Sequence, residues 1–526
     1  MQKSLKDIMN GKTFVHGVEL VTSRGSIQIE NAKTERFGHE IMDTDLFDFI
    51  SITDNPGGHP QIAPEVLGRS LLAKGHNVNI HMTCKDGNRN SLEMRAWQLA
   101  SDGFTNILAL TGDFPVAGHR GVARPMFDID SVALLKLYSD MNAGLEVPPM
   151  KKGALPVKLS KTNFYLSACV NPFKKFEAEY LPQYFKMEKK IRAGASYFIL
   201  QLGYDSRKWA ELLVYANMRN ITTPFLASIY VLTKGVAKLF HGDKLAGCVV
   251  SHTLLDQAIR HAKSPDKGKA FFLEFAAKQW AVARGLGFKG VYIGGTHKVD
   301  EIMKIKEMAD RFGKDDWKEF YKELSYPLPG EFYLFKQDDG GLPTREYQDA
   351  FMESKKSFRR IVRIVIAEPP VYRLSRVVHL LLFNPKSPFY YLMQAFYRAI
   401  DGKKPVEKVC HIFEHVSKAI LFGCHDCGDC SLSEIAYLCP EDKCSKNQRN
   451  GPCGGSRKGK CEVDEKKCIW LKAYDRLKPH GEERDPFEGP IIFTDAKLLN
   501  TSGWQNYYLG RDHTKCMKQR GHAEDI

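Results

Sequence analysis

The chain has 526 residues, of which 43% are hydrophobic and 26% are charged. These proportions are typical of folded globular proteins and exclude collagen-like, mucin-like and wholly disordered chains. The net charge of +14 leaves several classes of partner open, namely nucleic acid, a membrane surface, an acidic protein or a polyanionic small molecule.

Neither nucleic-acid binding nor a membrane span is predicted. The densest basic run has the spacing of one solvated helix face, and no interleaved aromatic platform or nucleic-acid motif accompanies it: Lys355, Lys356, Arg359, Arg360 and Arg363. The most apolar stretch, residues 361–383, is interrupted by charged and polar side chains: Arg363, Glu368, Arg373, Arg376 and His379. The first residues, MQKSLKDIMNGK, lack an apolar signal core, so we expect a cytoplasmic protein.

Short β-rich runs alternate with helical patterns through the first 300 residues. The predicted strands are 14–21, 47–53, 78–84, 106–111, 164–170, 197–202, 224–231 and 290–295. Helical spacing between them is clearest at 91–100, 131–141, 176–192 and 208–218. Eight such units predict an α/β fold, a (β/α)8 TIM barrel. A doubly wound open sheet is the alternative, disfavoured because no glycine-rich dinucleotide fingerprint follows the first strand.

The remaining chain is predicted to form a helical and cysteine-rich metal-binding domain. Residues 336–343 read as a loop, and helices are expected at 344–363, 370–382 and 390–400. The predicted domains are the barrel at 1–335, a helical connecting region at 336–415 and a cysteine-rich domain at 416–526.

Polar residues gather at the carboxyl ends of the predicted strands, where a TIM barrel builds its active site. They are Glu19, Thr53, His81, Thr83, Thr111, Gly112, Asp113 and Gln201, with Ala168 beside them. Each residue alone suits an ordinary cap or a core histidine. Together, a ring of polar groups around a wide mouth suits a flat polar cofactor such as a flavin.

Three segments near these positions resemble the methylenetetrahydrofolate reductase family. They are 79–84 (NIHMTC), 108–115 (LALTGDFP) and 189–195 (KKIRAGA), the last followed by Gln201. The resemblance extends over about residues 10–300. It implies a flavin-bearing barrel that reduces 5,10-methylenetetrahydrofolate to 5-methyltetrahydrofolate, with FAD or FMN as the flavin.

The resemblance also implies roles for single residues. Glu19 matches the acid that protonates the folate, Asp113 the acid beside flavin and pterin, and Gln201 the amide that touches substrate. Phe240 falls where the family has an aromatic ring that stacks on substrate or nicotinamide. The matched flavin contacts are Thr53, His81, Leu110, Thr111, Gly112, Asp113 and Ala168, with Lys189 and Lys190 near the flavin phosphates.

Eight of the 13 cysteines crowd into one C-terminal stretch. They are Cys424, Cys427, Cys430, Cys439, Cys444, Cys453, Cys461 and Cys468. In a cytosolic chain such crowding indicates metal rather than disulfides. Eight thiolates can hold two [4Fe–4S] clusters, two zinc ions or one of each, or the thiols can be free or regulatory; the C-x2-C-x2-C start favours iron–sulfur. The spacing leaves open which cysteines share a site.

Segments 439–446, 449–455 and 459–463 resemble the C-terminal module found with anaerobe-type methylenetetrahydrofolate reductases. There the module is often a separate iron–sulfur subunit, and here it is fused to the barrel. We therefore expect electrons from ferredoxin, another low-potential carrier or a partner oxidoreductase subunit to reach the flavin through the clusters. NAD(P)H as donor, the reverse oxidation, a non-catalytic folate-binding or electron-relay subunit, and a homo-oligomer stay open.

Overall fold

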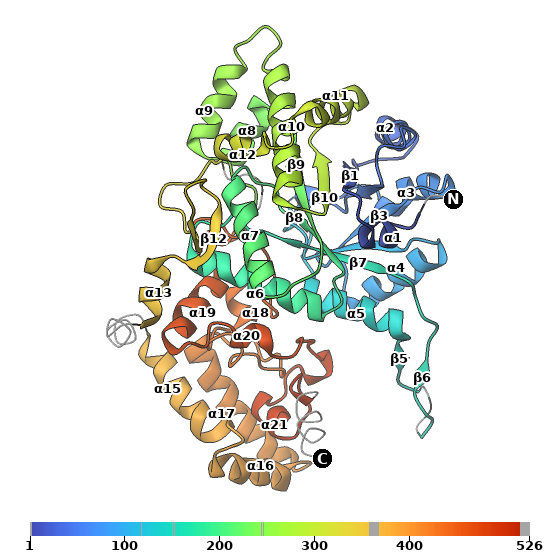
Figure 1. Ribbon diagram of the computed structural model, residues 1–526. Coiled ribbons are helices and arrows are strands. Elements are labelled where there is room, and N and C mark those ends of the chain that lie inside the picture. Colours follow the sequence, from blue (N-terminus) through green and yellow to red (C-terminus); the bar gives the residue numbers. More distant parts are fainter. Residues whose placement is uncertain are drawn as a thin grey trace.

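Eight parallel strands close into a barrel in the computed structural model, which describes residues 3–116, 118–149, 151, 153–242, 245, 247–356 and 368–515. The strands are β1 Val15–Leu20, β2 Phe49–Ile52, β3 Val78–Thr83, β4 Asn106–Leu110, β7 Tyr165–Val170, β8 Tyr197–Leu200, β9 Phe225–Tyr230 and β10 Gly290–Gly294. Strand β1 pairs with both β2 and β10, which closes the ring. The predicted TIM barrel is confirmed, and the open sheet is wrong (Figure 1).

Helices surround the barrel. They are α2 Ala32–Met42, α3 Pro64–Ala73, α4 Arg89–Ser101, α5 Ser131–Ala143, α6 Glu177–Arg192, α7 Ser206–Met218, α8 Lys234–His241, α9 His252–His261, α10 Lys269–Leu286, α11 Val299–Arg311 and α12 Trp317–Glu323. A further helix, α1 Leu5–Asn10, contributes Leu5 and Met9 to the core inside the barrel. The hairpin of β5 Glu146–Val147 and β6 Val157–Lys158 projects away from the barrel (Figure 1).

Alternate residues of each strand face two different cores, as the two-residue period of a strand requires. Phe49, Leu108 and Tyr292 pack inside the barrel. Their neighbours Ile50 and Ile107 pack outward, in the layer between strands and helices. This alternation of side chains decides which of the predicted site residues can reach the barrel mouth.

The segment after the barrel differs from the prediction. Residues 335–347 form a hairpin of β11 Phe335–Gln337 and β12 Pro343–Tyr347, where a loop and the start of a helix were expected. A turn closed by the Gly341 N–H on the Asp338 carbonyl joins the strands. The helix expected at 344–363 is described only as α13 Asp349–Lys356, and Arg359, Arg360 and Arg363 of the basic run lie outside the described residues.

Two layers of helix follow. Next to the barrel lie α18 Pro440–Lys443, α19 Ile469–Leu477, η3 Lys478–His480 and α20 Asp485–Glu488, with α19 and α20 against α6. Farther away lie α15 Pro370–Val378, η2 His379–Phe383, α16 Pro388–Ile400, α17 Lys404–Phe422, η4 Ala496–Leu498 and α21 Gly503–Tyr508 (Figure 1). Helix α17 runs through the predicted domain boundary at 415/416. None of the described helices has the length and apolar character that a membrane span needs.

Candidate active site and cysteine groups

Glu19 lies near the carboxyl end of β1, partly buried at the barrel mouth. Gly294 of β10 leaves room for it, because a Cβ there would lie 2.9 Å from the Glu19 Oε1 atom. The Tyr292 hydroxyl donates a hydrogen bond to Glu19 Oε2 at 3.3 Å. Burial raises the pKa of Glu19 to about 7, and the Tyr292 bond opposes that rise. Glu19 can therefore hold and release a proton near neutral pH.

His81 lies deeper in the same barrel interior. Its Nε2 atom is 2.8 Å from Ser51 Oγ, which also accepts a hydrogen bond from Asn79 at 3.0 Å. Burial lowers the pKa of His81 to about 3. The ring is therefore neutral and supplies hydrogen bonding, not charge.

Hydrogen bonds join the segments at the carboxyl ends of β1, β2 and β3. The Thr22 N–H donates to Thr53 Oγ1 at 3.2 Å. Asp54 Oδ2 accepts from the Thr83 N–H, the Thr83 hydroxyl and Arg95, at 3.1, 3.0 and 3.0 Å. Asp54 and Arg95 were missed by sequence reasoning, since only the fold brings β2 and α4 together.

The loop after β4 approaches its neighbours closely. Gly112 has a φ of +89°, and a Cβ there would lie 2.9 Å from the Thr83 Cβ. Only glycine fits such a left-handed, crowded position without strain. Asp113 Oδ2 accepts a hydrogen bond from the Gly57 N–H at 2.7 Å, and its residue stays partly exposed. Leu110, also partly exposed, packs on the core inside the barrel. The loop is thus packed closely against the end of β3.

Two neighbouring residues of β7 point to opposite sides of the barrel wall. Ala168 is fully buried in the layer between strands and helices, whereas Cys169 packs on the core inside the barrel. The structure therefore does not bring Ala168 to the mouth. A one-residue difference in strand register has this effect because successive side chains point to opposite faces.

On the opposite side of the mouth lie Gln201 and Tyr230. Gln201 is partly exposed, and its Oε1 atom accepts from the Leu202 N–H at 2.8 Å. Phe240, only 2% exposed, packs behind Tyr230 with ring centroids 5.6 Å apart. Burial raises the pKa of Tyr230 to about 12, and the negative charge of Glu19 adds to the rise. Tyr230, which the sequence did not single out, is the aromatic residue that is partly exposed here.

The two predicted phosphate-binding lysines have partners within the chain. Lys189, 1% exposed, donates to the Pro486 carbonyl at 3.1 Å. Lys190 donates to the Cys169 carbonyl at 2.6 Å. Burial lowers the pKa of both to about 8. Lys189 thereby holds the C-terminal segment against α6, while Lys190 reaches a strand that lines the mouth.

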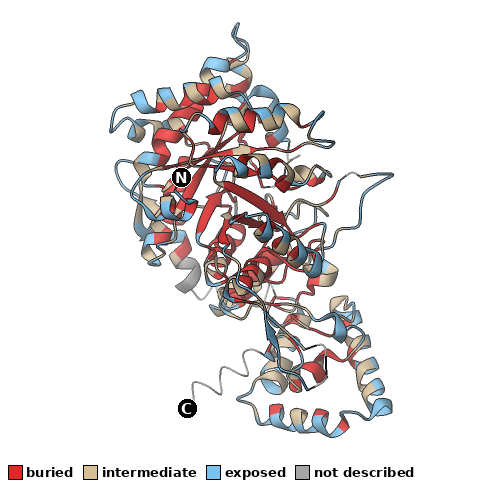
Figure 2. Ribbon diagram, turned by 90° about the vertical axis from the view of Figure 1, so that its right-hand side faces the viewer, coloured by how far each residue is buried: buried red, intermediate tan, exposed pale blue. Residues whose placement is uncertain are grey.

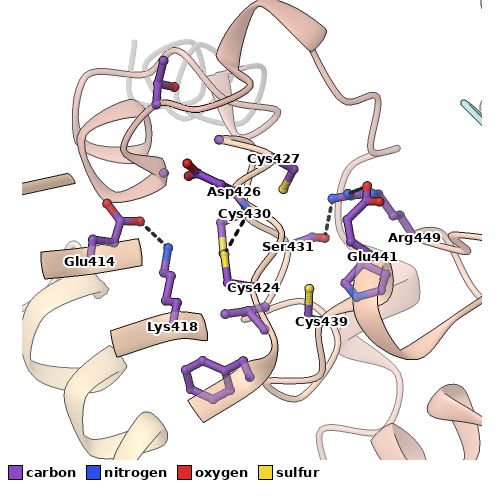
Figure 3. A pocket seen from close by; sticks show the side chains of 16 residues that line it. Glu414, Lys418, Cys424, Asp426, Cys427, Cys430, Ser431, Cys439, Glu441 and Arg449 are labelled. Atoms are coloured by element: carbon purple, nitrogen blue, oxygen red, sulfur yellow. Dashed lines mark hydrogen bonds and ion pairs between the residues drawn. The ribbon is translucent and has the colours of Figure 1, made fainter. Parts of the chain in front are cut away.

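The structure divides the eight cysteines into two groups of four. The first cysteine group, Cys424, Cys427, Cys430 and Cys439, lines one pocket together with Glu414 and Lys418 of α17 (Figure 3). The second cysteine group is Cys444, Cys453, Cys461 and Cys468. Burial raises the pKa of Cys444 and of Cys468 to about 12, and thiols of the same group add to the rise.

Backbone amides point at the sulfur atoms. The N–H groups of Asp426, Gly455 and Val463 donate to the cysteine two residues before each, at 3.4, 3.5 and 3.5 Å. Such bonds stabilise an anionic sulfur, so the chemistry of the two groups is compatible with thiolate ligands of a metal cluster. Among the described residues, no three His, Cys, Asp or Glu side chains are close enough to hold a single ion together.

The second cysteine group is packed directly on the barrel mouth. Lys446 donates to the Gly112 carbonyl at 2.8 Å, and the Thr111 hydroxyl donates to Gln448 Oε1 at 3.3 Å. Lys186 of α6 donates to the same Gln448 oxygen at 3.2 Å and to the Gly451 carbonyl at 2.9 Å. The loop between Cys444 and Cys453 therefore touches the residues predicted to hold a flavin.

Buried charges surround this contact. Lys446 is paired with Glu462, and both side chains are almost completely buried. Lys174, 2% exposed, donates to the Gly454 and Ser456 carbonyls, each at 2.5 Å. Lys174, Lys186, Lys446 and Glu462 were missed because no spacing signal in the sequence relates the barrel helices to the cysteine-rich segment.

Two family models match the chain. One, described as methylenetetrahydrofolate reductase, matches residues 39–305, and the other, described as methylene-tetrahydrofolate reductase C terminal, matches residues 404–492. The comparison with curated proteins found no match.

Two solved structures illustrate what the chain is similar to. One is an uncharacterized protein from Clostridium thermocellum that binds two copies of 5-methyl-5,6,7,8-tetrahydrofolic acid. It is 14% identical, with a TM-score of 0.40 over 58% of this chain and 96% of that one. The other is a dihydropteroate synthase from Coxiella burnetii in complex with pteroic acid. It is 12% identical, with a TM-score of 0.30 over 57% of this chain and 94% of that one.

Proposed function

The chain belongs to the methylenetetrahydrofolate reductase family of oxidoreductases, and from this premise we propose a specific reaction and electron supply. The protein reduces 5,10-methylenetetrahydrofolate to 5-methyltetrahydrofolate, or catalyses the reverse oxidation, with a flavin at the barrel mouth. Electrons are exchanged through metal clusters held by the two cysteine groups.

The residues at the mouth support flavin binding. Glycine at position 112 lets the loop after β4 lie close to the end of β3, and Leu110 at the end of β4 offers a partly exposed apolar side chain. Asp113 lies on the same loop, with one oxygen held by the Gly57 amide. A bound flavin, as FAD or FMN, supplies hydride transfer and converts between one-electron and two-electron chemistry.

Glu19 is the proton donor in this proposal. Its carboxyl group keeps a proton near neutral pH because burial raises its pKa to about 7. Tyr292 and Gly294 fix its position, so the proton can be delivered to the folate nitrogen as the ring opens. Gln201, partly exposed across the mouth, is available to bind the substrate.

One observation carries the electron route: the loop of the second cysteine group hydrogen-bonds to Thr111 and Gly112. A metal centre held by Cys444, Cys453, Cys461 and Cys468 is thereby attached to the loop that would hold the flavin. Iron–sulfur clusters held by four thiolates transfer single electrons. The first cysteine group, on the far side of the second, suits the entry point for electrons.

Anaerobic purification tests the proposal. We expect a yellow-brown protein with extractable flavin, iron and sulfide, which forms 5-methyltetrahydrofolate when reduced methyl viologen and 5,10-methylenetetrahydrofolate are added. NAD(P)H is tested in parallel as donor. Zinc in place of iron would contradict the electron route, and flavin-loaded protein without turnover in either direction would contradict the reaction and favour a non-catalytic subunit.

A further inference from the structure

Exposed apolar side chains are concentrated on the consecutive helical elements α15, η2, α16 and α17. Of the 25 large hydrophobic residues that are exposed in the described part of the chain, 15 lie between residues 374 and 421. Leu392, Val409, Phe413 and Ile420 are 64, 68, 69 and 78% exposed. We name these exposed side chains of 374–421 the apolar helical face. Concentrations of this kind mark interaction surfaces.

The apolar helical face is not a misplaced core, because the same helices have a second, buried side. Tyr390 and Tyr397 of α16 pack on Tyr508 of α21, with centroids 5.4 and 5.3 Å from its ring. Glu414 and Lys418 of α17 are buried and paired with each other. The outer sides of these helices remain exposed or half-buried, as the lower part of Figure 2 shows.

The charges around the apolar helical face are basic. The exposed basic residues of 370–422 are Arg373, Lys386, Arg398, Lys403, Lys404 and Lys408. Asp401, the exposed acid among them, is paired with Arg511 at 2.7 Å. Glu407 is turned inward, where it accepts a hydrogen bond from Gln505. A partner that covers this face therefore meets apolar side chains flanked by positive charge.

The apolar helical face continues into the first cysteine group. Helix α17 ends at Phe422, and Cys424 follows two residues later. Glu414, Lys418 and Phe422 of this helix line the pocket of the first cysteine group (Figure 3). Because Glu414 and Lys418 belong to the buried side of α17, a protein seated on its exposed side is separated by this one helix from the four thiols that are not packed on the barrel mouth.

We propose that the apolar helical face is the docking site of an acidic electron-transfer protein of the ferredoxin or flavodoxin type. This inference rests on the proposed function and names where its electron donor binds. The apolar centre supplies affinity, and the basic rim steers an acidic partner toward the first cysteine group. In each encounter the carrier is oxidised by one electron and this chain is reduced by one, without bond formation or proton transfer.

The test uses the full-length, metal-loaded chain and two exposed double variants, Val409→Ser/Phe413→Ser and Lys404→Glu/Lys408→Glu. Two matched variants serve as controls at exposed positions on the barrel side, Ile29→Ser/Leu155→Ser and Lys33→Glu/Lys314→Glu. The probes are a reduced acidic two-cluster ferredoxin and an acidic flavodoxin. Binding is measured as Kd at two salt concentrations, and turnover is measured with each carrier and with reduced methyl viologen.

We expect both α17 variants to weaken carrier binding at least about tenfold, with turnover on viologen unchanged, and the controls to bind normally. Salt should weaken binding of the wild type more than that of the Lys404→Glu/Lys408→Glu variant. The inference is overturned if the wild type binds neither carrier, or if the α17 variants bind as tightly as the controls.

Two other outcomes also overturn it: dimers of this chain that dissociate in the Val409→Ser/Phe413→Ser variant, and binding to phosphatidylserine vesicles in place of the carriers. Absence of turnover on viologen in the wild type would instead contradict the proposed function, so the two failures are distinguishable.

Discussion

At the scale of single residues, the environment of Glu19 sets its chemistry. The Tyr292 hydroxyl holds one carboxylate oxygen, and Gly294 leaves space for the other. The ordinary pKa of 4.5 rises to about 7 because the side chain is buried. The protonated form is therefore present below about pH 7 and is lost as the pH rises through that value.

Replacing Glu19 by Gln removes the proton but keeps the shape of the side chain. We expect the rate of 5-methyltetrahydrofolate formation to fall by about 10²–10⁴-fold, the usual contribution of a positioned acid. Flavin content and reduction of the protein by viologen should not change. Glu40→Gln, an exposed change on α2, is the control and should behave as wild type. A Glu19→Gln enzyme with normal turnover would remove Glu19 from the mechanism.

Replacing Tyr292 by Phe tests the pKa of Glu19 itself. The hydrogen bond from Tyr292 stabilises the carboxylate and lowers its pKa, so its loss should raise the pKa further. The rate falls with rising pH through about 7 in the wild type, and this decline should move to higher pH in Tyr292→Phe. The measurement is the pH profile of single-turnover folate reduction. A decline that stays in place, or moves to lower pH, would contradict this assignment.

At the scale of elements, the contact between the barrel and the second cysteine group depends on a buried ion pair. Lys446 and Glu462 are almost completely buried, and Lys446 also holds the Gly112 carbonyl. A buried pair contributes little compared with apolar residues, but removing one member leaves the other charge unpaired. The pair therefore makes the orientation of this loop sensitive to single substitutions.

We expect Lys446→Met to lower the free energy of unfolding by about 3–5 kcal/mol, because Glu462 would stay buried without its partner. The double variant Lys446→Met/Glu462→Met should recover most of that loss. Lys467→Met breaks an exposed pair with Asp475 and should cost less than about 1 kcal/mol. Denaturant unfolding of the metal-loaded wild type and of the three variants measures these differences. A double variant no more stable than Lys446→Met would show that the pair is not the cause.

Element boundaries show where local patterns are insufficient. Residues 343–347 form strand β12 although a helix was expected to begin at 344. The hairpin forms because a turn at Asp338–Gly341 lets β12 pair with β11 and pack on α7, contacts that no local pattern records. The sequence predicts strand β7 but does not show which of its side chains point into the barrel. Ala168 was therefore expected at the position that Cys169 occupies.

At the scale of the whole molecule, the two cysteine groups lie between the outer helices and the barrel. The first group borders α17, and the second contacts the loop after β4. Cys439 and Cys444 are five residues apart in the chain, yet each belongs to a different group.

This division predicts how metal is lost. Cys427→Ser should remove the metal of the first group, and Cys453→Ser should remove the metal of the second group. Each variant should keep about half of the wild-type metal per chain, because each group of four thiols is proposed to hold one metal site. Cys410→Ser, on α17 but outside both groups, should leave metal content unchanged. Metal analysis and electron paramagnetic resonance of the reduced proteins measure the outcome, with circular dichroism as a check on folding. Complete metal loss in a folded single variant would mean that the eight thiols share one site.

The sequence alone determined the barrel, the family and the set of cysteines. Alternating apolar runs and helical spacing are local signals, and eight repetitions leave few architectures that can bury them. Crowded cysteines likewise indicate metal wherever they occur in space.

Only the tertiary structure decided the division of the eight thiols, the buried lysines between the two parts, the inward position of Cys169 and the raised pKa of Glu19. Each of these depends on distance, burial or strand register. Such properties arise only when segments separated by up to hundreds of residues come into contact, and local sequence patterns do not encode those contacts.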